Sequence, residues 1–600
     1  MTFLLAGLLA LVPLVIAPGL LFYYDVTPKI ALFFIGTAAL LPLIGWRRLA
    51  ERRAGRLLLA LIALQTLSLF VSTALSSRPE LSLAGTSWRR FGLAVQIGML
   101  LFTAALASYL TARPERAWPI LRTSVIAGVI VALYGILQYF GWDPWINPAG
   151  YHIGEGVWGI VRPPGTLGYV SYFANYLVFI VFAAIALRLG DASRWSRLGA
   201  PAAALASVAI VLSGTRAAML AVTAGAAVLA LWYRPRVGRR ALMAAAVVVV
   251  AGLFFYLSPA GEKLRSRVHW AQEDPAGGAR LWLWRDSIRF GFAHWLVGTG
   301  PETFSSEFPP FQSVALARQF PDFYHESAHN IFLDAFTAQG VFGALILAGF
   351  CVLGFTAAVQ SRRVDRAAGA LCAGLAALIV THEFTVFVLP TALCFYAMIA
   401  ILVARAQGER PSPVVARPLW AALPVSFLLV FLAWRLAAGD RALFATRAAL
   451  DAGRAREAVG HYAAARQRGL SADLWYSRAM AMAAKRAQDP AGTIYAWQQA
   501  VEAGRRAVTT AEDRHNACYS LASLYAAQND LVNTERYLRQ AIDASPDWFK
   551  PHWTLAQVLL LTKNYEEARR EAARAVELNG GKNTEVSKTL EQANAALSQK

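Results

Sequence analysis

HESAHNIFLDAFTAQGVFG, residues 325–343, lies where a long polar loop ends and an apolar helix is predicted to begin. His325 and His329 stand on either side of that junction. The apolar run that follows continues far enough to span a bilayer, which takes about 20 residues. The stretch therefore predicts two histidines at one face of a membrane, and the rest of the chain indicates what they do there.

The composition excludes a single soluble domain. The chain has 600 residues, of which 57% are hydrophobic, and its mean hydropathy is +0.42. Apolar runs dominate residues 1–440, whereas residues 441–600 are rich in alanine and charge. Residues 1–440 carry 35 Lys and Arg against 20 Asp and Glu, so most of the net charge of +20 belongs to the apolar part. Membrane topology therefore explains the charge better than nucleic-acid binding does.

The apolar runs predict thirteen spanning helices. Their centres lie near residues 12, 37, 65, 101, 129, 180, 206, 224, 249, 343, 376, 397 and 428. If the N-terminus is cytoplasmic, the inside loops hold 20 Lys and Arg, whereas the short outside loops hold six. This is the asymmetry that membrane insertion favours. Loop 258–328 and everything after the last span are therefore expected on the outer side.

Residues 441–600 contain an internal repeat. The residues Leu521, Ala522, Tyr525, Leu538, Ala541 and Pro546 are followed 34 positions later by Leu555, Ala556, Leu559, Ala572, Ala575 and Gly580. This period, with small residues where paired helices touch, resembles tetratricopeptide repeats. Such arrays bind a protein or peptide in a concave groove, and we expect a protein partner here. The alternative is a rigid spacer without a partner.

Residues 325–329, HESAH, match the zinc-peptidase pattern H-E-x-x-H. On a helix this spacing would place both imidazoles on one face, with Glu326 activating a metal-bound water. Ser327, however, is a natural N-cap, and the apolar period begins only later. The helix start then separates His325 from the face of His329, and no third ligand follows. A zinc hydrolase is therefore the minor alternative, and we expect no metal.

Two arginines are predicted at the same membrane face as His329. Arg216 ends the polar break SGTR between two apolar runs, and Arg280 lies in loop 258–328. Guanidinium groups bind phosphate oxygens bidentately, and a neutral imidazole can accept a hydroxyl proton. The three residues suit a pyrophosphate and a hydroxyl nucleophile. The alternatives are a headgroup anchor for Arg216, a loop salt bridge for Arg280 and a helix cap for His329.

Four segments resemble, in order, the motifs of the O-antigen ligase and polymerase superfamily. HNIFLDAFTAQGVFG is similar to its signature of His-Asn followed by Gly-hydrophobic-hydrophobic-Gly. The other three segments are VRPPGTLGYVSYFANYL (161–177), LSGTRAAML (212–220) and ARLWLWRDSIRFGFAHWLVGTGPETF (279–304). The resemblance covers roughly residues 1–410.

The resemblance implies a glycosyltransferase that uses no metal and no cofactor. Such an enzyme transfers a glycan, with inversion, from an undecaprenyl-pyrophosphate-linked donor to an acceptor hydroxyl at the outer face of the bacterial inner membrane. Carried over by motif, Arg216 and Arg280 would bind the pyrophosphate, and His329 would activate the acceptor hydroxyl. The second-rank candidates are Arg162, His325 and Asn330.

The expected fold is all-α, with a GT-C-like membrane bundle of about 12–13 spanning helices followed by a soluble solenoid. Residues 1–410 would form the ligase-like domain, 411–440 an added span and linker, and 441–600 a periplasmic repeat domain. The expected partners are the lipid-linked donor, a lipid, glycan or protein acceptor, membrane lipids and a protein bound by the repeats, but no nucleic acid. Ligase and polymerase share these motifs, so both remain open, as does a non-catalytic membrane anchor for the repeats.

Overall fold

Helices account for nearly all of the regular structure. The computed structural model describes residues 1–154, 159–234, 238–273, 278–362, 365–406 and 420–599. Each predicted span is centred in a helix. These are α1 (Thr2–Leu14), α2 (Thr27–Leu40), α4 (Arg53–Ala74), α6 (Leu93–Ala112), α7 (Ala117–Tyr139), α8 (Val170–Gly190), α9 (Ser196–Ser213), α10 (Arg216–Tyr233), α11 (Arg239–Leu257), α16 (Ile331–Ser361), α17 (Ala368–His382), α18 (Leu389–Arg405) and α19 (Leu423–Asp451). The all-α polytopic fold is confirmed.

The spans differ in length. Eight helices of the described chain are long and apolar enough to cross a membrane: α4, α6, α7 with its preceding turn, α8, α9, α10, α16 and α19. The apolar helices α1, α2, α17 and α18 are shorter. These short helices pack against the long ones in a single bundle. The bundle is therefore that of a multi-pass membrane protein.

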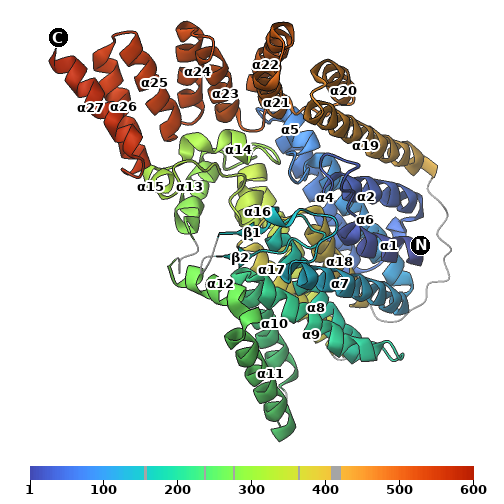
Figure 1. The fold of residues 1–600 in the computed structure, drawn as a ribbon. Coiled ribbons are helices and arrows are strands. Elements are labelled where there is room, and N and C mark those ends of the chain that lie inside the picture. Colours follow the sequence, from blue (N-terminus) through green and yellow to red (C-terminus); the bar gives the residue numbers. More distant parts are fainter. Residues whose placement is uncertain (155–158, 235–237, 274–277, 363–364, 407–419, 600) are drawn as a thin grey trace.

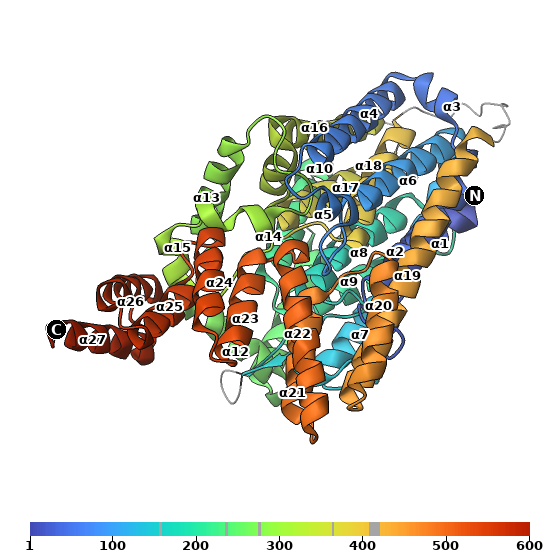
Figure 2. The same ribbon diagram turned by 90° about the horizontal axis from the view of Figure 1, so that it is seen from above.

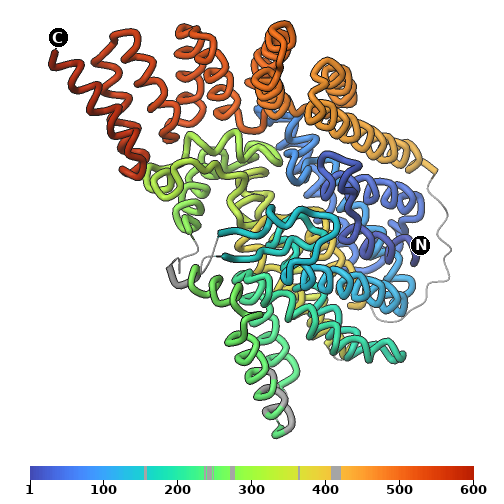
Figure 3. Tube along the Cα trace, viewed as in Figure 1, coloured from blue at the N-terminus to red at the C-terminus, as the bar shows by residue number. Residues whose placement is uncertain are grey.

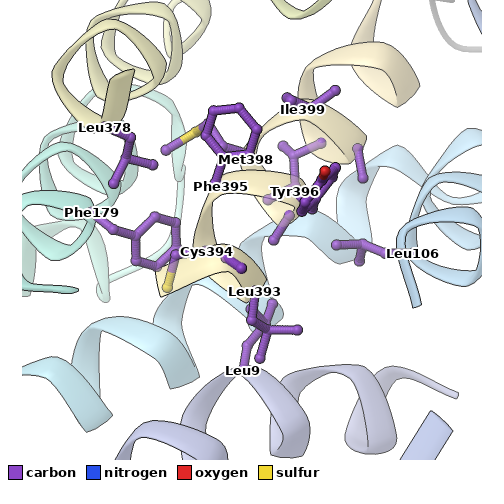
Figure 4. Close-up of a cluster of buried hydrophobic side chains, with 14 of the residues drawn as sticks. Leu9, Leu106, Phe179, Leu378, Leu393, Cys394, Phe395, Tyr396, Met398 and Ile399 are labelled. Carbon is purple, nitrogen blue, oxygen red and sulfur yellow. The ribbon is translucent and has the colours of Figure 1, made fainter. Parts of the chain in front are cut away.

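Helix α18 forms the centre of the bundle. Every residue from Leu389 to Ala404 is buried, which a helix without a polar face requires. It packs against α6, α16, α17, α8 and α1. Figure 4 shows Leu393 of α18 beside Leu9 of α1, and Cys394 of α18 beside Phe179 of α8. The core therefore surrounds α18, while the loops at the helix ends are available for a site.

The connections carry short elements. They are α3 (Trp46–Ala50), α5 (Pro79–Ala84), α12 (Glu262–Glu273), α13 (Arg280–Ala293), α14 (Phe304–Glu307), α15 (Val314–Gln319), a two-stranded antiparallel sheet of β1 (His152–Ile153) and β2 (Ile160–Val161), and the 3-10 turns η1 (41–43), η2 (114–116), η3 (148–150), η5 (259–261), η6 (309–311) and η7 (420–422). Helices α12–α15 all lie within the predicted outer loop 258–328, so the described part of this loop contains regular structure.

Residues 441–599 form a helical array that continues α19. Helix α19 runs without interruption across the predicted boundary at 440/441. Residues 411–419 of the predicted linker lie outside the described residues, as do residues 407–410 before it. The following helices are α20 (Ala455–Gln467), α21 (Asp473–Arg486), α22 (Pro490–Thr510), α23 (Arg514–Ala526), α24 (Leu531–Ala544), α25 (Phe549–Leu561), α26 (Tyr565–Asn579) and α27 (Thr584–Ser598). Figures 1 and 3 show them as an arc along one side of the membrane helices.

The 34-residue period coincides with the helix contacts of this array. Helices α23 and α24 pair, as do α25 and α26, and the two pairs stack on each other. The recurring positions Leu521 and Leu555 are fully buried, as are Leu538 and Ala572 on the second helix of each pair. Burial at equivalent positions is what a stack of repeated hairpins produces. That the array is a tetratricopeptide domain stays a prediction.

Candidate active site

Helix α16 begins at Ile331, two residues after His329. Asn330, not Ser327 as predicted, is its N-cap: the Asn330 side-chain oxygen accepts from the backbone N–H groups of Phe332 and Leu333, both at 3.0 Å. Ser327 is buried and its hydroxyl accepts from the His329 N–H at 3.2 Å. Both histidines therefore precede the helix, and Ser327 shapes the loop instead of starting the helix.

The loop that carries His329 is held from several directions. The Ala328 N–H donates to the Asp334 carboxylate at 3.0 Å, and the Ala328 carbonyl accepts from the Trp284 indole at 3.1 Å. The Asn330 amide donates to Glu383, beyond the end of α17, at 2.5 Å. His329 itself has a φ of +52°. A non-glycine residue rarely adopts a positive φ, so the contacts of Ala328 and Asn330 are needed to hold the His329 backbone in this conformation. They thereby fix the point from which the imidazole projects.

A buried ion-pair network supports the same loop from behind. The Arg89 guanidinium lies 2.5 Å from Glu302 and 3.8 Å from Asp334, the residue that receives the Ala328 N–H. Glu302 also accepts from the Thr86 N–H at 3.1 Å. Arg89 is not among the residues that the sequence motifs single out. The charge asymmetry predicts few arginines in the short outer loops, and the position of Arg89 in such a loop could have indicated a special role.

The glycines of the His-Asn motif and of segment 279–304 interlock. Helix α16 is broken at Gly340, whose φ is +68° and where an added Cβ would lie 2.3 Å from the Leu296 carbonyl oxygen. Gly298, also at φ +68°, faces the same kink, with an added Cβ 2.3 Å from the Ala338 carbonyl carbon. The Gly300 N–H donates to the Ala338 carbonyl at 2.9 Å. Both glycines are thus required by backbone contact between the two motifs.

A cavity of about 400 Å³ lies in front of the histidine loop. Its lining includes five of the six candidate residues, namely Arg162, Arg216, Arg280, His325 and His329. They lie directly after β2, at the start of α10, at the start of α13 and in the loop before α16. Asn330 is not in the lining, because its side chain caps α16 and contacts Glu383. The structure thus brings together segments more than 160 residues apart in sequence.

A fourth arginine, Arg267 of α12, also lines the cavity. Its Nε donates to the Gly214 carbonyl at 3.2 Å. Burial, and then the neighbouring charges of Arg162 and Arg216, lower the pKa of Arg267 to about 10. No sequence pattern singles out Arg267, because only the folded chain brings α12 to the cavity. Among the described residues of the lining none is acidic, so the site is suited to a multiply charged anion.

Aromatic side chains complete the lining. They are Tyr169, Trp270, Phe320, Phe323 and Phe384. Arg162 lies over the Tyr169 ring at 5.4 Å, and Arg280 over the Phe384 ring at 5.8 Å. Such cation–π contacts orient guanidinium groups without neutralising their charge. The cavity therefore combines positive charge with flat apolar surfaces.

The histidines of the cavity are uncharged at neutral pH. Burial lowers the pKa of His329 to about 3, and the charges of Arg280, His325 and Arg89 act in the same direction. Burial lowers the pKa of His325 to about 4, against the opposing effect of Asp286. An imidazole without a proton on one nitrogen can accept a hydrogen bond from a hydroxyl group.

The geometry of residues 325–329 does not match that of the zinc-peptidase pattern. The HESAH residues lie in a loop, whereas the pattern places its two histidines on one face of a helix. Within the described ranges, no group of three or more His, Cys, Asp or Glu side chains is arranged to hold a metal ion.

The comparisons with known proteins concern the middle of the chain. Residues 201–348 match the family model described as O-antigen ligase. The matched stretch contains Arg216, Arg267, Arg280 and both histidines of the cavity. The match supports the resemblance to the ligase and polymerase superfamily over these residues, and it reaches neither segment 161–177 nor the repeat array. No curated protein matches the chain.

Proposed function

We propose, from the premise that residues 201–348 form an O-antigen ligase domain of the ligase/polymerase superfamily, that this chain is a glycan ligase. It transfers a glycan from an undecaprenyl-pyrophosphate-linked donor to an acceptor hydroxyl, with inversion and without a metal. The transfer takes place at the outer face of the bacterial inner membrane, with the N-terminus in the cytoplasm and the repeat array in the periplasm.

The observation that carries the proposal is the convergence of four arginines and two neutral histidines on one cavity. Arg216 and Arg280 bind the pyrophosphate oxygens, with Arg162 and Arg267 beside them. Guanidinium groups retain their charge and form forked hydrogen bonds to phosphate, so they also offset the charge that develops on the leaving group. The cavity lies at the ends of apolar helices, where a lipid-linked donor would present its pyrophosphate.

His329 acts on the acceptor. Its neutral imidazole accepts a hydrogen bond from the acceptor hydroxyl and orients the oxygen towards the anomeric carbon. As the new C–O bond forms, the hydroxyl proton passes to the imidazole. The bond from the anomeric carbon to the phosphate oxygen breaks, and its electron pair leaves with undecaprenyl pyrophosphate. The low pKa of His329 makes it a poor base alone, but a bound pyrophosphate adds negative charge beside Arg280 and raises that pKa.

The aromatic lining suits the sugar. The rings of Tyr169, Trp270 and Phe384 offer flat surfaces against which the apolar face of a pyranose can pack. A polymerase of the same superfamily would use the same donor site with a second lipid-linked glycan as acceptor. The products separate these two reactions, since only polymerisation lengthens the lipid-linked chain.

The proposal is tested in cells that depend on this chain for transfer. His329→Ala and Arg216→Ala should each cause the lipid-linked glycan to accumulate while the acceptor stays unmodified. Arg188→Ala, at an exposed position at the end of α8, is the matched control and should leave transfer unchanged. Normal transfer by both site variants, at equal protein level, would refute the mechanism.

A further inference from the structure

Residues 313–325, the segment that leads to the histidines, lie against the helical array. Helix α15 packs on α26 of the array. In that contact Ala317 is buried together with Phe549, Ala575 and Leu578. Figure 2, in which the molecule is seen from above, shows α15 beside α25 and α26. A short helix of six residues has little stability alone, so this apolar contact fixes its position.

Polar contacts continue along the same segment. The Arg318 Nε donates to the Glu577 carbonyl at 2.7 Å, and the Lys582 ammonium donates to the Arg318 carbonyl at 2.6 Å. Further along, the Lys550 ammonium pairs with Asp322 at 2.6 Å. The array therefore contacts the segment through both its backbone and its side chains.

The segment separates the array from the cavity. On the side of the array, Tyr324 packs edge-on against His515 of α23, with ring centroids 6.0 Å apart. On the opposite side, Phe320, Phe323 and His325 line the cavity that holds the arginines. The array is thus the second layer of this cavity wall.

The array also contacts the loop that carries Arg89. The Arg78 guanidinium donates to the carbonyls of Thr509 at 3.0 Å and Ala511 at 2.9 Å. The Ser87 N–H donates to Glu512, and the Ser305 hydroxyl donates to the Glu512 carbonyl at 3.3 Å. Since Arg89 supports Asp334 and hence the His329 loop, the array touches both segments that place the histidine.

We propose that the helical array is a positioning element of the transfer site. By holding residues 313–325 and 78–87, it keeps the histidines at the distance from the arginines that transfer requires. Ala317, Asp322 and Lys550 are positioning residues and do not touch substrate. This inference rests on the proposed function for its effect on transfer, but the docking itself is independent of that function.

The first test measures hydrogen exchange of the full-length protein in nanodiscs. Ala317→Glu buries a charge in the α15–α26 contact and should speed amide exchange across residues 313–330 at least tenfold, while helix α18 keeps its protection. Val532→Glu, at an exposed position of α24, is the matched control and should change neither region. Unchanged exchange of 313–330 in Ala317→Glu would overturn the proposal.

The second test uses charge reversal and its rescue. Asp322→Lys places two ammonium groups together and should lower kcat several-fold, with little effect on the KM for the donor. The double variant Asp322→Lys with Lys550→Asp restores the attraction and should recover kcat. Faster exchange together with wild-type kcat would overturn the proposal. If the wild-type protein transfers no glycan, the proposed function fails, and the exchange result still decides whether the array holds the segment.

Discussion

At the scale of single residues, the loop that carries His329 depends on an arginine that is buried together with two carboxylates. Arg89 has two carboxylate neighbours, Glu302 and Asp334, and all three lie behind His329. The cavity in front of His329 carries the opposite pattern, with four arginines and no acidic residue among the described lining. The loop between them therefore separates a buried ion-pair network from a positively charged cavity.

Removing Arg89 tests the network. Arg89→Met should lower the free energy of unfolding by about 3–5 kcal/mol, because Glu302 and Asp334 would remain buried without their cation. Thermal unfolding in nanodiscs measures this, with Arg188→Met as the exposed control. Equal unfolding temperatures for the two variants would show that the network does not stabilise the loop.

The buried histidines make stability depend on pH. The pKa of His325 is about 4 in the folded protein and 6.5 in a model peptide, so the unfolded chain binds more protons between these values. The contribution of His325 to the free energy of unfolding is fully present above pH 6.5 and is lost as the pH falls. The loss is about 2 kcal/mol between pH 7 and pH 5. His325→Gln should therefore lose less stability on acidification than the wild type, as measured by unfolding at both pH values.

A matched control for this experiment is His461→Gln. His461 lies on the surface of α20 and its side chain is 40% exposed. The variant should follow the wild-type pH dependence. If His325→Gln loses as much stability as the wild type, burial of a neutral imidazole does not account for the acid sensitivity.

At the scale of elements, the kink of α16 joins the two motifs of the site. Gly340 has a positive φ and touches the Leu296 carbonyl, while the His-Asn end of the same helix carries His329. A straight helix would therefore displace either the cavity wall or the histidine loop.

Gly340→Ala should lower the free energy of unfolding by about 1–3 kcal/mol through backbone strain, and by more if the 2.3 Å contact cannot relax. Gly7→Ala is the matched control. Gly7 lies in α1 with nothing within 4 Å of an added Cβ, so alanine should leave stability unchanged or raise it by up to about 1 kcal/mol. Equal stability of the two variants, measured by thermal unfolding, would contradict the role given to the kink.

The elements were predictable from sequence, whereas their contacts were not. Long apolar runs located all thirteen helices, because hydropathy and length decide membrane insertion. The start of α16 was placed at the wrong residue, since Ser327 and Asn330 are both good caps and only the tertiary contacts choose between them. Arg267 and Arg89 were missed for the same reason: their roles depend on segments that meet only in the folded bundle.

At the scale of the whole molecule, the array lies behind the segments that place the histidine loop and lines no part of the cavity itself. Helix α19 connects the membrane helices and the array without a break, and the array returns to contact loops 78–87 and 313–325. The 34-residue repeat predicted a stack of hairpins, but no sequence pattern indicated that the stack would contact its own chain.

Single-turnover transfer by the purified full-length protein in nanodiscs tests the central claim most directly. The donor is a synthetic undecaprenyl-pyrophosphate glycan, and the readout is the rate of glycan transfer to an acceptor hydroxyl. His329→Ala should lower the rate at saturating donor by about 10²–10⁴-fold, because proton transfer loses its acceptor. Arg216→Ala should lower the rate and weaken donor binding, and the product should have the inverted anomeric configuration. Wild-type rates in both variants, or retention of configuration, would contradict the account.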